Sequence, residues 1–216
     1  HDNLCYANRH PGIHVSTNGD SPVHPMRDIA IVNNTCAANG WEDWGGGIAL
    51  DDPDARGVLV RNNICSANRY FQIVVSPEAD PRTAVIARNL VDGFRGTEGE
   101  TLGEAAVQGD PLFVAAARGD FHLRPGSPAI DAGSPDRASS TDFEGNPRPR
   151  DGNGDGIAAW DLGAFERQVQ PEARSISSRA MRVHSTNRRA SPCTVNVSFS
   201  TISSRQPRVR SRAPRR

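Results

Sequence analysis

Short apolar runs recur along the first hundred residues, each three to five residues long and rich in β-branched side chains. Before a recurring asparagine the runs are 29–32, 58–60 and 84–86, and after it they are 12–15, 47–50 and 72–75. Runs of this length and composition are typical of β-strands. No stretch before residue 100 has apolar residues at the 3.6-residue spacing of a helix. The pattern therefore predicts an all-β chain whose repeats each contain two or three short strands.

The polar residues between these runs repeat as well, at offsets of 31, 29 and 26 residues. Self-similarity at such a period is typical of a stacked repeat architecture, in which equivalent residues lie about 4.8 Å apart. Asparagine tolerates left-handed backbone geometry at tight turns, and stacked amides can hydrogen-bond to one another. We therefore predict two asparagine columns, one of Asn3, Asn34, Asn63 and Asn89 and one of Asn8, Asn39 and Asn68.

A cysteine follows the first asparagine of a copy by two residues at Cys5, Cys36 and Cys65, and Val91 takes this position in the fourth copy. Small apolar side chains at one repeat position indicate an inward-facing column, where cysteine acts as a small hydrophobe. Oxidation between neighbouring thiols is the alternative to reduced, buried packing. Cys193 lies elsewhere, with no evident partner.

Together these motifs resemble the rungs of the right-handed parallel β-helix of the pectate-lyase-like superfamily. The pattern NNT-x-x-x-N, GGI-x-L, V-x-NNI-x-x-x-N and I-x-V carries the resemblance across residues 1–95. It implies a solenoid of three to four rungs in residues 1–108. Because the chain begins inside a rung, we expect it to be a C-terminal fragment whose first rungs are missing. The resemblance is specific for the fold and does not specify an activity.

Residues 109–167 form a second block, with the motifs DPLF, DFHLRPGSPAIDAG, GNPR and DLGAFE in that order. The block resembles the segment that closes many secreted bacterial β-helix proteins. This resemblance implies a structural end-piece of a secreted or cell-surface protein. Within it, Ser127 is expected to be a turn residue and not a nucleophile.

The closing block contains a candidate calcium loop. Asp151, Asn153 and Asp155 place oxygen-bearing side chains at positions 1, 3 and 5, and Gly156 follows. This spacing is typical of calcium loops. Leu162 stands where such loops usually have a bidentate glutamate, and Asp161 is the substitute we expect. A structural Ca²⁺ is therefore predicted, with a metal-free Gly-Asp turn as the alternative.

Charge divides the chain at residue 167. Residues 1–167 contain 14 Arg against 24 Asp and Glu, whereas residues 168–216 contain 11 Arg and one Glu, and the chain has no lysine. For residues 168–216 we favour a disordered basic tail or out-of-frame translation over an arginine-rich nucleic-acid arm, because basic charge alone does not identify a specific partner. We also expect a monomer with no membrane span, since no run approaches about 18 apolar residues.

One loop, between the second asparagine of each copy and the next strand, occupies the same position in every repeat. It gathers aromatic and polar side chains, which are His10, Trp41, Glu42, Trp44 and Tyr70. Aromatic faces stack on sugar rings and carboxylates accept hydrogen bonds from hydroxyls, so this flank predicts contact with a polysaccharide. Packing of the aromatic rings against the solenoid is the alternative.

The candidate catalytic residues are His14, Asp43 and Asp51. His14 lies between Ile13 and Val15 and should point outward, where it could transfer a proton. Asp51 begins the acidic stretch 51–54, whose paired carboxylates suit acid–base hydrolysis or calcium-assisted elimination. A solvated histidine and an Asp-rich turn before proline are the alternatives.

The motif content does not specify a reaction. The chain lacks the Gly-His-Gly and Arg-Ile-Lys motifs of polygalacturonases, and Arg9, Arg61 and Arg69 lie in no recognisable lyase motif. A body charge of about −10 disfavours acidic polysaccharides. We predict a secreted or surface protein that contacts carbohydrate, with lyase or glycoside hydrolase activity open. A non-catalytic scaffold or adhesin is the alternative.

Overall fold

The computed structural model describes residues 1–16, 26–42, 44–169 and 195–196. These residues form short β-strands and two 3₁₀ helices, and no helix among them is long and apolar enough to cross a bilayer. The elements are β1 (Leu4–Tyr6), β2 (Ile13–Val15), β3 (Ala30–Val32), β4 (Thr35–Ala37), β5 (Ile48–Leu50), β6 (Val58–Arg61), β7 (Ile64–Ser66), β8 (Ile73–Val75), η1 (Pro81–Thr83), β9 (Ala84–Ala87), β10 (Leu90–Asp92), β11 (Val107–Gln108), β12 (Phe113–Ala115), η2 (Ala116–Arg118), β13 (Asp120–Leu123) and β14 (Val195–Asn196).

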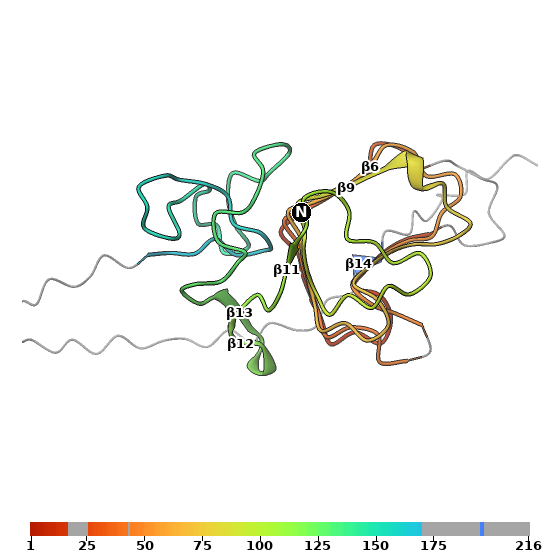
Figure 1. Ribbon diagram of the computed structural model, residues 1–216, viewed down its shortest axis with the longest axis horizontal. Coiled ribbons are helices and arrows are strands. Elements are labelled where there is room, and N and C mark those ends of the chain that lie inside the picture. The colour runs from red at the N-terminus through yellow and green to blue at the C-terminus, as the bar shows by residue number, and fades with distance from the viewer. Residues whose placement is uncertain (17–25, 43, 170–194, 197–216) are drawn as a thin grey trace, which may run out of the picture.

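Three parallel sheets stack the repeats of the sequence. Their strand orders are β1-β4-β7-β10-β11, β14-β2-β5-β8 and β3-β6-β9. Seen along the stack, successive coils superimpose around a common interior (Figure 1). The predicted all-β, solenoid-like architecture is therefore confirmed.

The register of the first sheet aligns the cysteines. Cys5 pairs with Cys36, and Cys36 pairs with Cys65. All three thiols are buried and reduced, so the predicted packing is confirmed and no disulfide joins them. The hydrogen bond with Cys5 lowers the pKa of the Cys36 thiol, but the hydrogen bond with Cys65 and burial outweigh it and raise that pKa well above its usual value.

Both predicted asparagine columns are present. In the first, the side-chain amide of each residue donates to the Oδ1 of the next copy, at 2.9 Å from Asn3 to Asn34, 2.8 Å from Asn34 to Asn63 and 2.9 Å from Asn63 to Asn89. The second column runs from Asn8 to Asn39 and on to Asn68, with 2.9 Å at both steps. Gln72 ends this column, because its Oε1 accepts from the Asn68 amide at 2.8 Å.

The left-handed turn residue is not the column asparagine, and our expectation on this point is wrong. The residue before each column asparagine has positive φ, as at Asn33 (54°), Asn62 (56°) and Ala38 (52°). The turn therefore bends one residue earlier. The asparagine that follows the positive-φ residue then directs its side-chain amide along the stack.

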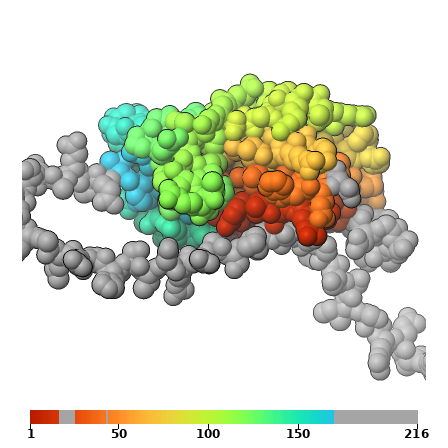
Figure 2. Space-filling view, turned by 90° about the horizontal axis from the view of Figure 1, so that it is seen from below, coloured from red at the N-terminus to blue at the C-terminus, as the bar shows by residue number. Residues whose placement is uncertain are grey.

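The closing block lies beside the solenoid, against the outer face of the sheet that contains β1, β4, β7 and β10 (Figures 1 and 2). Apolar side chains form the contact, with Leu4 and Ala37 packed on Phe121 and Phe165. Backbone bonds add to it, including Gly163 N–H to the Asn62 carbonyl at 2.8 Å. Loop 93–106 instead crosses the end of the stack, where it bridges to β8 and β9.

The C-terminal segment is described only at β14, which pairs in parallel with β2. Cys193 and the other residues of 170–194 and 197–216 lie outside the described residues. The expectations for the tail therefore stay predictions.

Candidate functional site

The predicted aromatic flank is assembled by the loop that connects β4 to β5, described at residues 40–42 and 44–46. The Gly40 and Glu42 N–H groups donate to the carbonyls of Asn8 and Arg9 in the coil below, at 2.9 and 3.0 Å. Gly40 has φ of 92°, and a Cβ there would lie 2.3 Å from the carbonyl oxygen of Gly45. Glycine at this position therefore lets the two ends of the loop meet.

Trp41, Glu42, Arg69 and Tyr70 line a shallow hollow of about 550 Å³ on this flank. The Arg69 Nη1 donates to the Trp41 carbonyl at 2.6 Å, and its guanidinium lies 5.1 Å from the centre of the Tyr70 ring. Arg9 pairs with Glu42 at 3.0 Å. Trp41 itself is 59% exposed, so its indole is available to a ligand.

A second group lies along the same flank and centres on Trp44. Its ring centroid is 5.5 Å from that of His14 and 5.0 Å from that of Phe71. Trp44 remains 42% exposed, whereas Phe71 is buried. Trp44 thus packs on the solenoid through Phe71 and also faces solvent, and its contact with a polysaccharide stays a prediction.

His14 and Asp51 meet beside Trp44. His14 points outward between buried neighbours, as expected, and its Nε2 lies 3.3 Å from the Asp51 Oδ2. Both side chains are partly exposed. A histidine held by a carboxylate is an arrangement that can transfer a proton.

His10 and Asp52 do not join this pair. Asp43 lies outside the described residues. His10 is exposed, and its backbone is close to the position that a Cβ on Gly45 would take. Asp52, the expected partner of Asp51, is buried and accepts the Asp54 N–H at 2.7 Å. The two adjacent carboxylates therefore do not face one substrate together, because the turn directs Asp52 inward.

Sequence reasoning missed the arginines of the flank. In the sequence, Arg9 and Arg69 are candidates only as lyase bases, and neither lies in a recognisable motif. The repeat could have placed these arginines on the flank, because each directly follows an asparagine of the second column. They therefore occupy equivalent positions two coils apart.

The side chains of the candidate calcium loop make hydrogen bonds to groups of the loop itself. Asp151 accepts N–H groups from Gly154 at 2.6 Å and Gly156 at 2.8 Å, and these bonds lower its pKa. Asn153 Nδ2 donates to Asp155 Oδ2 at 3.0 Å. The described residues contain no group of three or more His, Cys, Asp or Glu side chains arranged to hold a metal.

Asp161 does not complete the loop as we expected. It is fully buried, and its oxygens accept the N–H groups of Asp131 at 2.7 Å and Arg167 at 2.6 Å. The nearer acidic side chain is Asp131, which sequence reasoning missed. It accepts N–H groups from Gly152 and Asn153, at 3.1 and 2.9 Å.

Asp161 belongs instead to a buried ionic cluster inside the closing block, with Glu166 and Arg148. The Arg148 Nε lies 3.5 Å from Glu166 Oε2, and its Nη1 donates to the Asp161 carbonyl at 3.3 Å. Burial raises the pKa of Asp161 to about 6. Burial and the nearby Asp161 charge raise the pKa of Glu166 to about 7. The cluster has no opening to solvent, so its role is structural.

Comparisons with known proteins return no match, either among protein-family models or among curated protein sequences. The function proposed below is therefore based on the geometry of the flank.

Proposed function

We propose that the protein is a right-handed parallel β-helix of the pectate-lyase-like type, secreted or held at a cell surface, that contacts a glycan along its aromatic flank. The observation that carries this proposal is the exposed indole of Trp44, set between His14 and Phe71. A half-exposed ring that is held from behind offers a rigid face at little entropic cost, which suits the flat face of a sugar ring.

The spacing of the flank supports a chain-like ligand. Trp41 and Trp44 lie in one loop and Tyr70 lies in the equivalent loop of the next coil, so the flank extends along the stack over two coils about 4.8 Å apart. Glu42 and Asp51 place carboxylate acceptors beside them for sugar hydroxyls. Because the body has a net charge of about −10, a neutral glycan fits this flank better than an acidic one.

We expect Trp44→Ala to weaken glycan binding at least about tenfold, since loss of an aromatic anchor typically costs more than 1 kcal/mol. A glycan array followed by calorimetric titration on the best ligand measures this. Phe143→Ala is the matched control, because Phe143 is 48% exposed but lies in the closing block. Absence of binding by the unaltered protein, or equal loss in both variants, contradicts the proposal.

Cleavage of the glycan is the second candidate, favoured by the His14–Asp51 pair at 3.3 Å. If the pair transfers a proton, incubation releases new reducing ends or unsaturated, ultraviolet-absorbing products, and His14→Gln abolishes them while binding remains. Binding without either product supports the non-catalytic scaffold or adhesin.

For the calcium loop we propose that Asp151, Asn153 and Asp155 bind a structural Ca²⁺ without Asp161. A carboxylate oxygen has two lone pairs, so the backbone bonds described above leave acceptor capacity for a cation. We expect millimolar Ca²⁺ to raise the melting temperature by several degrees and Asp155→Ala to remove that increase. Asp136→Ala is the control, since Asp136 is an exposed aspartate that pairs with Arg61 outside the loop. An unchanged melting temperature in the unaltered protein contradicts the site.

A further inference from the structure

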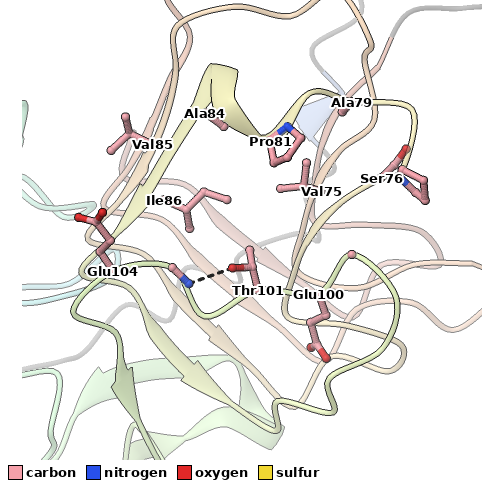
Figure 3. Close-up of a pocket in the computed structure, with 13 residues that line it drawn as sticks. Val75, Ser76, Ala79, Pro81, Ala84, Val85, Ile86, Glu100, Thr101 and Glu104 are labelled. Carbon is pink, nitrogen blue, oxygen red and sulfur yellow. Dashed lines mark hydrogen bonds between the residues drawn. The ribbon is translucent and has the colours of Figure 1, made fainter.

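The end of the stack that loop 93–106 crosses is covered only in part. A hollow of about 570 Å³ remains between the end of β8, η1, β9 and the loop. Val75, Pro81, Ala84 and Ile86 form its apolar lining (Figure 3). A volume of this size is in the range of sites that bind small molecules or peptide side chains.

The hollow adjoins an open sheet edge. β9 is the last strand of its sheet, and among the described residues the loop bridges to it only at Ala87, through Glu104. The Glu104 N–H donates to the Ile86 carbonyl at 2.8 Å. Before that point no described strand pairs with the outer edge of β9. Edge strands present N–H and C=O groups to a further strand. On β9 the Ala84 N–H already donates to the Pro81 carbonyl and the Ile86 carbonyl accepts from Glu104, so the Ala84 carbonyl and the Ile86 N–H are the groups that remain for a further strand.

The side chains of β9 alternate between the two sides of this edge. Ala84 and Ile86 pack on the core, whereas Val85 is 53% exposed. Figure 3 shows Ile86 and Thr101 toward the interior and Val85 and Glu104 on the outer side. A strand added above β9 would therefore place one side chain in the hollow and the next one beside Glu104.

Charge indicates the chemistry of that strand. The two segments that border the hollow, 76–86 and 97–104, contain five carboxylates against one guanidinium, for a net charge of −4. The guanidinium of Arg82 is already paired with Asp80, with both contacts at 3.0 Å. The surface around the open edge therefore favours a basic partner.

We propose that the edge of β9 binds an extended basic peptide of another protein by strand addition, with a β-branched side chain in the hollow and an arginine or lysine facing Glu104. Main-chain bonds to the Ala84 carbonyl and the Ile86 N–H supply binding, and the hollow and Glu104 select alternate side chains. This site is separate from the aromatic flank and does not depend on the function proposed for that flank.

Fluorescence anisotropy with the full chain and the labelled peptide Gly-Val-Arg-Val-Arg-Val-Gly tests the proposal at low salt. We expect saturable binding of this peptide. Binding should be at least about tenfold weaker when its arginines are replaced by glutamates, which reverses the charge. N-methylation of its central residues should weaken binding by as much, because it removes N–H donors but keeps the charge. Glu104→Gln should weaken binding at least about threefold. Glu144→Gln is the matched control, because Glu144 lies in the closing block.

A hollow-filling variant, Ala84→Phe, should abolish binding if its melting temperature shows that it folds. The N-methylated peptide tests the same point on the unaltered protein. No binding at about 1 mM peptide, or equal binding of the N-methylated peptide, overturns the proposal. A photocrosslinker at Val85 that captures the chain's own arginine-rich segment in place of the peptide also overturns it.

Discussion

Asn63→Ala is expected to lower the free energy of unfolding by about 4 kcal/mol, a large part of the stability of an ordinary domain. The Asn63 side chain makes four hydrogen bonds inside the stack. Its Oδ1 accepts the Asn34 backbone N–H at 2.9 Å and amide at 2.8 Å, and its Nδ2 donates to the Ile31 carbonyl at 2.8 Å and to Asn89 at 2.9 Å. Alanine leaves these buried partners unsatisfied. Denaturant unfolding followed by circular dichroism measures the change.

Asn3→Ala is the matched control for this prediction. Asn3 stands at the end of the same column, is only half-buried, and its side chain donates one hydrogen bond, to Asn34 at 2.9 Å. We expect a loss of about 1 kcal/mol there. Equal losses in the two variants would mean that the column contributes no more in its middle than at its end, contrary to the argument from burial.

Arg148→Met is expected to cost about 3–5 kcal/mol at pH 8, because it leaves two buried carboxylates without their cation. The Arg148 side chain is fully buried, and besides lying near Glu166 it donates to the Gly163 carbonyl at 2.9 Å. Arg148 lowers the pKa of both Asp161 and Glu166, so its removal makes their ionised forms still less favourable. Thermal unfolding at several pH values measures the effect.

The loss should shrink as the pH falls. The pKa values of Asp161 and Glu166 are raised from 3.8 to about 6 and from 4.5 to about 7 in the folded chain. The folded state therefore binds more protons than the unfolded state between about pH 4 and 7. The stability that these groups contribute is complete below pH 4 and is lost as pH rises through 6 and 7. At pH 5 both groups are largely protonated, and Arg148→Met costs less than at pH 8.

Arg150→Met provides the control for Arg148. Arg150 is an exposed arginine two residues away, and an exposed charge of this kind contributes little to stability. We expect a change below about 0.5 kcal/mol with no trend in pH. A pH-independent loss in Arg148→Met would show that packing alone, and not the buried charges, explains the role of the arginine.

The solenoid was predictable because the residues that define its coils repeat along the sequence. When a sequence repeats at offsets near thirty residues, equivalent side chains must stack, and Cys36 can then have no neighbours but Cys5 and Cys65 in its column. The same logic placed Trp41, Trp44 and Tyr70 on one flank. Two details inside the repeat could not be predicted from the sequence. One is which residue of the turn has positive φ, and the other is that Asp52 points inward, because the local backbone conformation decides both.

The aromatic, histidine and carboxylate side chains of the candidate site were named from the sequence, whereas its arginines were not. His14 and Asp51 are 37 residues apart and meet because β2 and β5 pair in register. Phe71, which supports Trp44, belongs to the same repeated loop and could have been named from its position. Asp131 lies beside the candidate calcium loop through contacts that follow no period, so no pattern in the sequence indicated it.

The sequence by itself determined the stacked architecture, the two asparagine columns, the thiol column and the flank on which the aromatic rings gather. All of these follow from one repeated spacing and from the need of each coil to bury its apolar side chains against the next. The tertiary structure alone decided where the closing block lies, that Arg148 is buried with Asp161 and Glu166, and that no other described strand pairs with the outer edge of β9. These features depend on single contacts between segments distant along the chain, and such contacts leave no periodic trace in the order of the residues.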